Sequence, residues 1–406
     1  EDTKHILQEN NRNYHKSEAY KVLAIFLGNG LLTSEGDFWR RQRKLTQPAF
    51  YKQRLALMVT MMNEEVVSLT KRWQQNNAGA PVDITEEMLN LTLAIVTKAL
   101  FSTDVKHRLG GISESLNEIM HFADNTLKSF IRFPLHFPTP RNLRFKRAVH
   151  KVEDVIYSII EGRRADIKRN AEVRYDDLLD MLMHTQDEET GETMTNRQLR
   201  DEVTTIFMAG HETTANALSW ALYLLAKHQN VLEKLRREIE TVLGDDGLPT
   251  FENVRELKYT LQVVQEVMRL YPPAWIMGRK SIGADHLSGY AIAANSYLIL
   301  PIYLLHRHPN YWEKPHDFYP DHFLSEAVRS RPTYAYIPFG GGPRMCVGNN
   351  FALMEMQIVL AILVRKFDFS PVQNGEVKPD PLVTLRPKNK LKMNITPIAG
   401  SETENA

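Results

Sequence analysis

The segment Phe339 to Gly348 reads FGGGPRMCVG and contains the only cysteine of the 406-residue chain. An isolated cysteine is most often a small buried hydrophobe. Here three glycines and a proline precede it, so the backbone can turn tightly and surround a sulfur with peptide N–H groups. Apolar residues at helical spacing follow from Phe351 to Leu363, which predicts a loop that opens a helix. A helix N-terminus and the nearby cation Arg344 both favour thiolate over thiol, so Cys346 is predicted to be an anionic ligand or a nucleophile.

The flanking sequence favours a ligand. A cysteine nucleophile requires a base beside it, and no short-range pattern of His with Asn or Asp supplies one. A zinc site requires three further ligands, and the sequence contains neither CxxC nor HExxH spacing. Haem iron needs one thiolate only, because the macrocycle provides the other ligands. The segment FGGGPRMCVG resembles the haem-ligand loop of the cytochrome P-450 monooxygenases, which implies that Cys346 binds the iron of haem b.

The composition is compatible with that family but does not point to it. Fifty Lys and Arg against 49 Asp and Glu give a net charge of +1, which provides no electrostatic argument for nucleic-acid binding. One cysteine excludes an intramolecular disulfide. No apolar run approaches the roughly 18 to 20 residues that span a bilayer, and the N-terminal EDTKHILQEN resembles no signal peptide. We expect a cytoplasmic monomer, which would be membrane-associated only if an anchor preceded residue 1.

The apolar periodicity predicts a mainly α fold with a small β part. Helices are predicted over Leu55 to Trp73, Thr85 to Phe101, His150 to Ile167, Asn196 to Lys227, Val231 to Leu243, Leu257 to Leu270 and Gly348 to Val364. Thr85, followed by two glutamates, is expected to cap its helix, and Pro272-Pro273 to end another. Short strands are predicted over Ile276 to Ile282, Tyr290 to Ala293 and Tyr297 to Leu300, and an ordered loop over His308 to Arg331.

The resemblance also implies an architecture. Haem is expected between the long helix at about 196–227 and the cysteine-loop helix at about 348–364. We expect one haem-thiolate domain over residues 1–406, without the N-terminal helix and strands that usually begin the family's fold and without a fused reductase.

Polar residues interrupt the centre of the apolar helix Asn196 to Lys227 in the string AGHETT, from Ala209 to Thr214. Polar groups in a buried helix require a reason, and a threonine there can bond the carbonyl one turn earlier. The string resembles the family's oxygen-activation site. The resemblance implies that Glu212 and Thr213 form the acid–alcohol pair that delivers protons during oxygen activation, with Ala209 lying against the haem.

The pattern ExxR is informative at one position only. It begins at Glu9, Glu161, Glu233, Glu252, Glu266 and Glu326, and most such pairs are solvated helix contacts. Only Glu266 and Arg269 precede a Leu-Tyr-Pro-Pro string, as the family's buried structural pair does. A third member comes from Pro320-Asp321-His322-Phe323, where His322 replaces the usual arginine, so pairing is expected to be weaker.

Several residues match the family's contacts to the haem. Trp39 and Arg43, one helical turn apart on a helix beginning near Ser34, share a face and match a WxxxR pair. By the same resemblance Arg344, Arg279 and, with less support, His306 are expected to contact the propionates. Phe339 is expected to pack near the thiolate side of the ring.

Basic residues around Trp39 suggest a redox partner. Arg40, Arg41 and Lys44 point away from Arg43 on the same helix, on the side of the haem where family members bind an electron donor. We expect an acidic ferredoxin or a flavodoxin-like reductase, supplied with electrons by NAD(P)H.

The substrate class follows from apolar pocket residues. The resemblance places Ile206, Ala209, Ala274, Trp275, Ile276, Val383 and Thr384 along the pocket. This lining predicts a hydrophobic substrate. The AGHETT string and its neighbours resemble those of bacterial and animal long-chain fatty-acid hydroxylases, which implies a fatty acid in first place, with a terpenoid or steroid in second. A haem-thiolate peroxygenase or isomerase is the alternative, and a non-catalytic haem sensor or lipid carrier is a third possibility.

Overall fold

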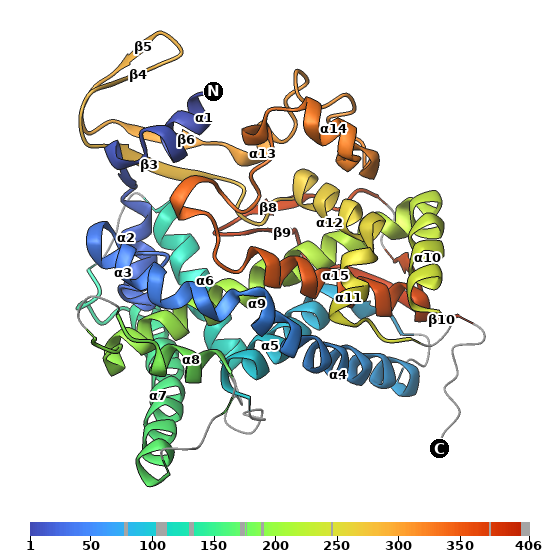
Figure 1. Ribbon diagram of the computed structural model, residues 1–406, viewed down its shortest axis with the longest axis horizontal. Coiled ribbons are helices and arrows are strands. Elements are labelled where there is room, and N and C mark those ends of the chain that lie inside the picture. The colour runs from blue at the N-terminus through green and yellow to red at the C-terminus, as the bar shows by residue number, and fades with distance from the viewer. Residues whose placement is uncertain are drawn as a thin grey trace.

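Helix α9 (Asn196–Lys227) runs through the centre of the molecule, with α5, α7, α12 and α15 packed around it (Figure 1). Its start is fixed by a capping box in which the side chains and backbone N–H groups of Thr195 and Gln198 bond reciprocally. Gly210 permits the close approach of α5, since a Cβ there would lie 3.0 Å from Cγ2 of Val96. The mainly α prediction is confirmed.

The computed structural model describes residues 1–76, 80–102, 112–129, 134–170, 175, 177–187, 191–244, 247–372 and 375–398. The remaining α-helices are α1 (Asp2–Lys4), α2 (Ala19–Leu27), α3 (Gly36–Thr46), α4 (Lys52–Asn76), α5 (Ile84–Phe101), α6 (Ile112–Lys128), α7 (Pro140–Arg169), α8 (Leu178–His184), α10 (Gln229–Leu243), α11 (Phe251–Glu256), α12 (Lys258–Leu270), α13 (Ile302–Leu305), α14 (Ser325–Ser330) and α15 (Asn349–Lys366).

The strands form small antiparallel sheets around the helices. They are β1 (Tyr14–Lys16), β2 (Val82–Asp83), β3 (Met277–Ser281), β4 (Asp285–Leu287), β5 (Tyr290–Ile292), β6 (Tyr297–Leu300), β7 (Phe367–Pro371), β8 (Pro379–Pro381), β9 (Leu385–Pro387) and β10 (Lys392–Pro397). One sheet has the order β1-β3-β6 and a second the order β2-β10-β7, while β4 pairs with β5 and β8 with β9. In the first sheet Lys16 lies opposite Arg279.

Most predicted elements are confirmed, with differences at their ends. The helix predicted to be capped by Thr85 begins at Ile84, because the Asp83 side chain accepts the Thr85 N–H at 3.2 Å. Helix α12 ends before Pro272-Pro273, as predicted. The predicted loop 308–331 contains short helical turns, including α14. Helices α2 and α6 and the shorter helices α1, α8, α11 and α13 were missed. Helix α2 is apolar on nearly all sides and so lacks a clear period.

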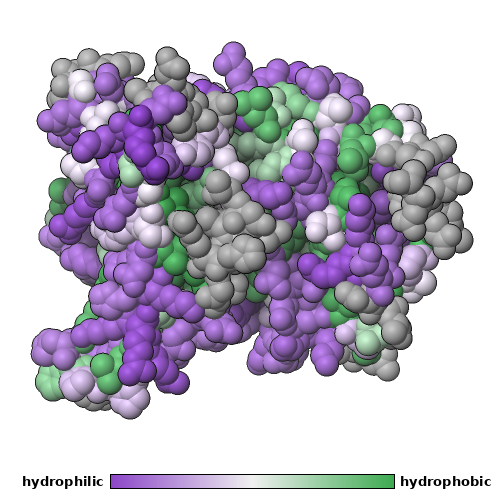
Figure 2. Space-filling view, turned by 90° about the horizontal axis from the view of Figure 1, so that it is seen from below, coloured by the Kyte–Doolittle hydropathy of each residue, from purple (hydrophilic) through white to green (hydrophobic). Residues whose placement is uncertain are grey.

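One large cluster of buried apolar side chains holds the helices together, and its members extend along the chain from Val22 to Ile395. Each fully buried large side chain contributes about 1.5–3 kcal/mol. None of the described helices is long and apolar enough to cross a membrane. Figure 2 shows a face on which hydrophilic residues predominate, with hydrophobic side chains gathered in narrow groups between them.

Candidate functional site

The loop before α15 positions Cys346 through backbone geometry. Gly340 and Gly342 have φ angles of +74° and +63°, which residues with a Cβ rarely adopt. A Cβ on Gly342 would also collide with the backbone of Leu7. The Cys346 N–H donates to the carbonyl of the half-buried Phe339 at 2.9 Å, which closes the loop. The backbone conformation of the segment FGGGPRMCVG is therefore fixed by its glycines and by this hydrogen bond.

The Cys346 side chain is accessible within a dense part of the protein. It keeps accessible surface, although the surrounding protein is dense enough that burial raises the pKa of the thiol. The Gly348 N–H and the Arg43 guanidinium both lower that pKa, and Arg43 is held there by a 2.7 Å hydrogen bond to the Met345 carbonyl. Arg344 was expected from the sequence to exert this charge effect, but the cation that acts on the sulfur is Arg43.

One face of α9 is accessible although most of the helix is buried. Ala209 is exposed, and Ile206, Gly210 and Thr213 are partly exposed. Their spacing of three, four and seven residues places them on a single face. Covering apolar surface with another apolar group is favourable. A hydrophobic ligand is therefore expected against this face.

Glu212 and Thr213 have different partners. Thr213 Oγ1 donates to the Ala209 carbonyl at 2.6 Å, the bond to the preceding turn that the sequence predicts. Glu212 is buried and accepts a 2.6 Å hydrogen bond from Thr384 Oγ1, which accepts in turn from Asn216 Nδ2 at 3.1 Å. Thr384, predicted as a pocket residue, is thus a partner of Glu212. Asn216 was missed, and its place one helical turn after Glu212 was the available signal.

Three basic side chains converge beside the cysteine loop. Lys16 and Arg279 are opposite each other on neighbouring strands, and the Arg344 guanidinium lies 4.1 Å from the centroid of the Trp39 ring. Burial, and after it the charge of Arg344, lowers the pKa of Lys16 to about 7. Arg279 also acts on Lys16 and on Arg344, so the three charges lie close together.

Acidic side chains balance this basic group only in part. Glu35 forms an ion pair with Arg344 and accepts the backbone N–H of Lys16 at 2.8 Å. Like charges placed opposite each other in a ladder are destabilising. The basic group therefore suits a ligand that brings more than one negative charge. The sequence analysis missed Lys16, because it stands in a three-residue strand without a motif.

The Glu266–Arg269 pair of α12 is fully buried and fully hydrogen-bonded. Arg269 binds both carboxylate oxygens of Glu266, at 2.7 and 2.8 Å. Its other N–H groups donate to the carbonyls of His306, Pro315 and Asp317 at 2.8 to 2.9 Å. The pair thereby fixes the irregular segment after α13 to α12, which is the structural arrangement predicted from the sequence.

His322 takes the predicted third place in this cluster. Its Nδ1 lies 3.2 Å from Oε1 of Glu266. Arg331 donates to the His322 carbonyl at 3.1 Å, and its guanidinium lies 3.9 Å from the centroid of the Trp312 ring. Arg331, which the sequence analysis missed, adds a permanent positive charge beside the histidine that replaces the family's arginine.

His306 belongs to the same cluster and not to the basic group beside the cysteine loop. It is fully buried, and its Nε2 accepts the backbone N–H of Ile337 at 2.9 Å. Burial and the charge of Arg269 lower the pKa of His306 to about 3. A neutral imidazole engaged with the backbone is not the propionate donor that the sequence suggested, so that expectation is corrected.

The residues predicted to line the substrate pocket differ in exposure. Ala274 and Ile276 are exposed, and Val383 is partly exposed. The Trp275 indole N–H donates to the Leu382 carbonyl at 2.9 Å, so it ties the segment after α12 to the turn before β9. These side chains carry no charge, and their place along a substrate pocket stays a prediction.

The family profile of cytochrome P-450 matches residues 1–394. A protein from Streptomyces melanosporofaciens named cyclooctatin synthase is 34% identical over 360 residues, which cover 88% of this chain and 77% of that protein. The chain belongs to the cytochrome P-450 family. A second P-450 relative, taurochenodeoxycholic 6 alpha-hydroxylase of Sus scrofa, is 30% identical over 393 residues, covering 93% of this chain and 77% of the relative.

The fold agrees with a solved P-450 structure. The crystal structure of the haem domain of a cytochrome P-450DA mutant matches with a TM-score of 0.86 at 26% identity, over 98% of this chain and 86% of that chain. This P-450 is therefore an oxidoreductase of the monooxygenase type, which implies haem, O2 and an electron donor.

The residues of this P-450 fit a haem. The described residues contain no group of three or more His, Cys, Asp and Glu that could hold a bare metal ion. A haem needs one protein thiolate, and Cys346 is an accessible cysteine that can supply it. The open face of α9 offers apolar surface to a flat ring. The incompletely balanced basic group around Lys16, Arg279 and Arg344 offers cations to two propionates.

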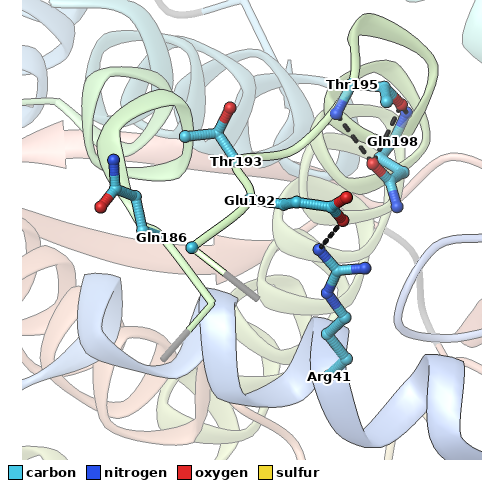
Figure 3. Close-up of a pocket in the computed structure, with 7 residues that line it drawn as sticks. Arg41, Gln186, Glu192, Thr193, Thr195 and Gln198 are labelled. Carbon is cyan, nitrogen blue, oxygen red and sulfur yellow. Dashed lines mark hydrogen bonds and ion pairs between the residues drawn. The ribbon is translucent and has the colours of Figure 1, made fainter. Parts of the chain in front are cut away.

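The expected redox surface of the P-450 is partly occupied by internal contacts. Figure 3 shows Arg41 reaching from α3 to the Glu192 carboxylate, with Nη2 to Oε2 at 3.0 Å, beside a surface hollow of about 600 Å³. Arg41 also lies 3.4 Å from Asp187. Arg41 is thus half-buried and paired with Glu192 and Asp187, whereas the side chains of Arg40 and Lys44 are exposed. Arg40 pairs with Asp37 of its own helix.

Proposed function

We propose that this P-450 binds haem b through Cys346 and inserts one oxygen atom from O2 into a hydrophobic small molecule. The observation that carries the proposal is the accessible Cys346 thiol in a locked loop, together with an accessible face of α9 that includes Thr213. Haem, when bound, supplies reductive oxygen activation. Arg279 and Arg344 would hold its propionates, with Trp39 stacked on Arg344.

The chain supplies proton-handling groups on α9. The Thr213 hydroxyl lies on the accessible face, where it can hold a proton or a water at Oγ1. Glu212 is the buried acid behind it, and Thr384 with Asn216 fixes the orientation of its carboxyl group. In this proposal protons pass from Glu212 to Thr213.

We further propose that the chain acts as one haem domain and as a monomer in the cytoplasm. The single large core cluster from Val22 to Ile395 supports one domain. Electrons would come from NAD(P)H through a ferredoxin or a flavodoxin-like reductase that binds near Arg40 and Lys44 on α3.

The substrate is proposed to be a fatty acid in first place and a terpenoid or steroid in second. Uncharged side chains at Ile206, Ala209, Ala274, Ile276 and Val383 support a hydrophobic ligand. The relative from Sus scrofa, named taurochenodeoxycholic 6 alpha-hydroxylase, supports keeping the terpenoid or steroid class. Spin-state titrations of the ferric holoprotein against panels of fatty acids, terpenoids and steroids would rank the two classes.

A carbon monoxide difference spectrum of the reduced holoprotein tests the thiolate. We expect a strongly red-shifted absorption band in the wild type and in the matched Val347→Ala variant, and its loss in Cys346→His. A wild-type spectrum without that band would refute the proposed ligand. Turnover with reductant and O2, compared with turnover on peroxide alone, then separates a monooxygenase from the alternative peroxygenase.

A further inference from the structure

Helix α5 packs along the middle of α9, next to the string AGHETT (Figure 1). The Thr92 hydroxyl of α5 donates to the carbonyl of His211 at 2.9 Å. One turn later on α5, Val96 lies against Gly210, where a Cβ would lie 3.0 Å from Val96 Cγ2. Two successive turns of α5 therefore meet two successive residues of α9, and the absence of a side chain at Gly210 allows this close approach.

Thr92 is a polar residue in an apolar interface. Its exposed fraction is 0%, and its neighbours one turn away on α5, Met88 and Val96, are buried apolar side chains. Burying a hydroxyl costs free energy unless the hydroxyl is hydrogen-bonded, whereas an apolar side chain of similar size carries no such cost. Solvent does not compete for a hydroxyl at this depth. The Thr92 hydroxyl is therefore satisfied by main-chain carbonyls.

The Thr92 hydroxyl has two carbonyls at equal distance. It lies 2.9 Å from the Met88 carbonyl of its own helix and 2.9 Å from the His211 carbonyl of α9, with the Leu89 carbonyl farther away at 3.3 Å. A bond to the carbonyl one turn earlier is open to any threonine in a helix, whereas the bond to His211 requires that α9 lie this near. With one proton between two acceptors, the hydroxyl links the main chains of α5 and α9.

The contact lies on the side of α9 opposite to its accessible face. On that face the Thr213 hydroxyl donates to the Ala209 carbonyl. His211 follows Ala209 by two residues, which is about 200° around a helix of 3.6 residues per turn. Carbonyls on opposite sides of α9 thus accept one hydroxyl each. Thr92 therefore holds from behind the backbone that carries Glu212 and Thr213.

The His211 side chain is engaged within its own helix. Its Nδ1 donates to the Phe207 carbonyl at 3.1 Å. Burial lowers the pKa of His211, against a smaller rise caused by Glu212, so the folded protein favours the neutral imidazole. The part of His211 that meets α5 is its carbonyl, which belongs to the peptide group that joins His211 to Glu212.

We propose that Thr92 is a positioning residue whose hydroxyl holds the peptide group between His211 and Glu212, and thereby the orientation from which Glu212 passes a proton to Thr213. This inference rests on the proposed function for the roles of Glu212 and Thr213. The bond from Thr384 fixes the carboxyl end of Glu212, whereas the bond from Thr92 fixes the main chain at its other end. Both ends of the proton donor are then held.

Thr92→Val tests the proposal, because it removes the hydroxyl and keeps the branched shape. The product formed per electron pair should fall about two- to ten-fold, the factor that corresponds to one neutral hydrogen bond. Thr92→Ser keeps the hydroxyl and should keep the wild-type yield. Thr97→Val is the matched control, since Thr97 is a buried threonine of the same helix whose hydroxyl has no hydrogen-bond partner among the described residues. Haem content should be equal in all four proteins, because neither position lies in the cysteine loop.

A double-mutant cycle with Glu212→Gln separates positioning of the acid from a general loss of structure. If Thr92 acts through Glu212, Thr92→Val should lower the product yield in the wild-type background and should lower it no further in Glu212→Gln. Equal fold losses in the two backgrounds would overturn the proposal. An unchanged yield in Thr92→Val, or an equal loss in Thr97→Val, would overturn it as well.

Amide hydrogen exchange of the holoprotein tests the contact without turnover. The amides of residues 211–216 should exchange faster in Thr92→Val than in the wild type and Thr97→Val, while those of α12 exchange alike in all three; unchanged exchange in the middle of α9 would overturn the proposal. Should Thr92→Val fail to fold, Thr92→Ala is compared with Thr92→Ser, because these two differ only by the hydroxyl. Absence of the red-shifted carbon monoxide band from every protein would refute the haem-thiolate function, while amide exchange would still decide whether Thr92 holds α9.

Discussion

Thr213 is accessible and also makes a hydrogen bond within its own helix. Its hydroxyl donates to the Ala209 carbonyl, and its side chain is the only one of the Glu212–Thr213–Thr214 string that is not buried. Such a hydroxyl can exchange its intrahelical bond for a bond to a ligand or water with little rearrangement. Its chemical role is therefore separable from its structural role.

Thr213→Ala should reduce the yield of oxygenated product per electron pair by about ten-fold or more, the lower range for loss of a proton-transfer group. Haem content and the carbon monoxide band should stay unchanged, because Cys346 is unaffected. Product and peroxide are measured together during turnover. Ser219→Ala is the control, since Ser219 makes the same kind of bond to Ala215 at a buried site; an equal loss in both variants would contradict the assignment.

Glu355 of α15 is a buried acid that the proposed chemistry does not use. Neither of its oxygens has a hydrogen-bond partner among the described residues. Burial raises the pKa of Glu355 well above its ordinary value, while the nearby Thr214 hydroxyl lowers it to a smaller extent. The folded protein therefore favours the protonated form.

Because the pKa of Glu355 is raised on folding, stability should fall as the pH rises above the ordinary carboxyl range. Glu355→Gln removes that loss. The variant should match the wild type near pH 4.5 and exceed it by about 1–3 kcal/mol at pH 8, the cost of an unsatisfied buried polar group. Urea unfolding of the holoprotein at both pH values measures this, with the exposed Glu326→Gln as control. A constant difference across pH would contradict the prediction.

At the scale of elements, α12 acts as an anchor for the chain that follows it. Arg269→Lys keeps the charge but cannot bind both oxygens of Glu266 and three carbonyls at once. The variant should lose about 3–5 kcal/mol of stability, as expected when a buried pair is broken. Arg237→Lys, on the surface of α10, should stay within about 0.5 kcal/mol. Chemical unfolding of the two holoproteins compares them, and similar midpoints would contradict the anchoring role.

Features that depend on residues close together in the chain could be predicted from the sequence. The turn before Cys346, the break at Pro272-Pro273 and the Thr213 bond each depend mainly on neighbours within a few residues. Most contacts between distant segments could not be predicted, because spacing in a sequence does not specify which side chains meet across elements; the contact of His322 with Glu266 was expected only through the family resemblance. Thr384 is therefore a partner of Glu212 and not a free pocket wall, and Lys16 lies beside Arg279 without any signal in its own strand.

At the scale of the whole molecule, the exposed positive charge of α3 is the surface expected to meet an acidic electron donor. Arg40→Glu with Lys44→Glu should slow reduction by a ferredoxin by about ten-fold at low ionic strength and flatten its salt dependence. Arg237→Glu, on the surface of α10, serves as the control, because it makes the net charge more negative by the same amount as each of the two α3 substitutions. Stopped-flow reduction measures the rates. Unchanged rates with an unchanged salt dependence would remove this surface from consideration.

The positive charges of Lys16, Arg279 and Arg344 also repel one another in the protein before haem binds. Without a dianionic ligand, repulsion across the β1–β3 ladder opposes the final assembly of the N-terminal segment. Phosphate should therefore raise the melting temperature of the apoprotein more than chloride at equal ionic strength, an effect that vanishes once haem is bound. Equal melting temperatures in the two salts would contradict this. Capture of the cofactor would then be the last step of folding, and a chain that has not yet met haem would be the form most exposed to proteolysis.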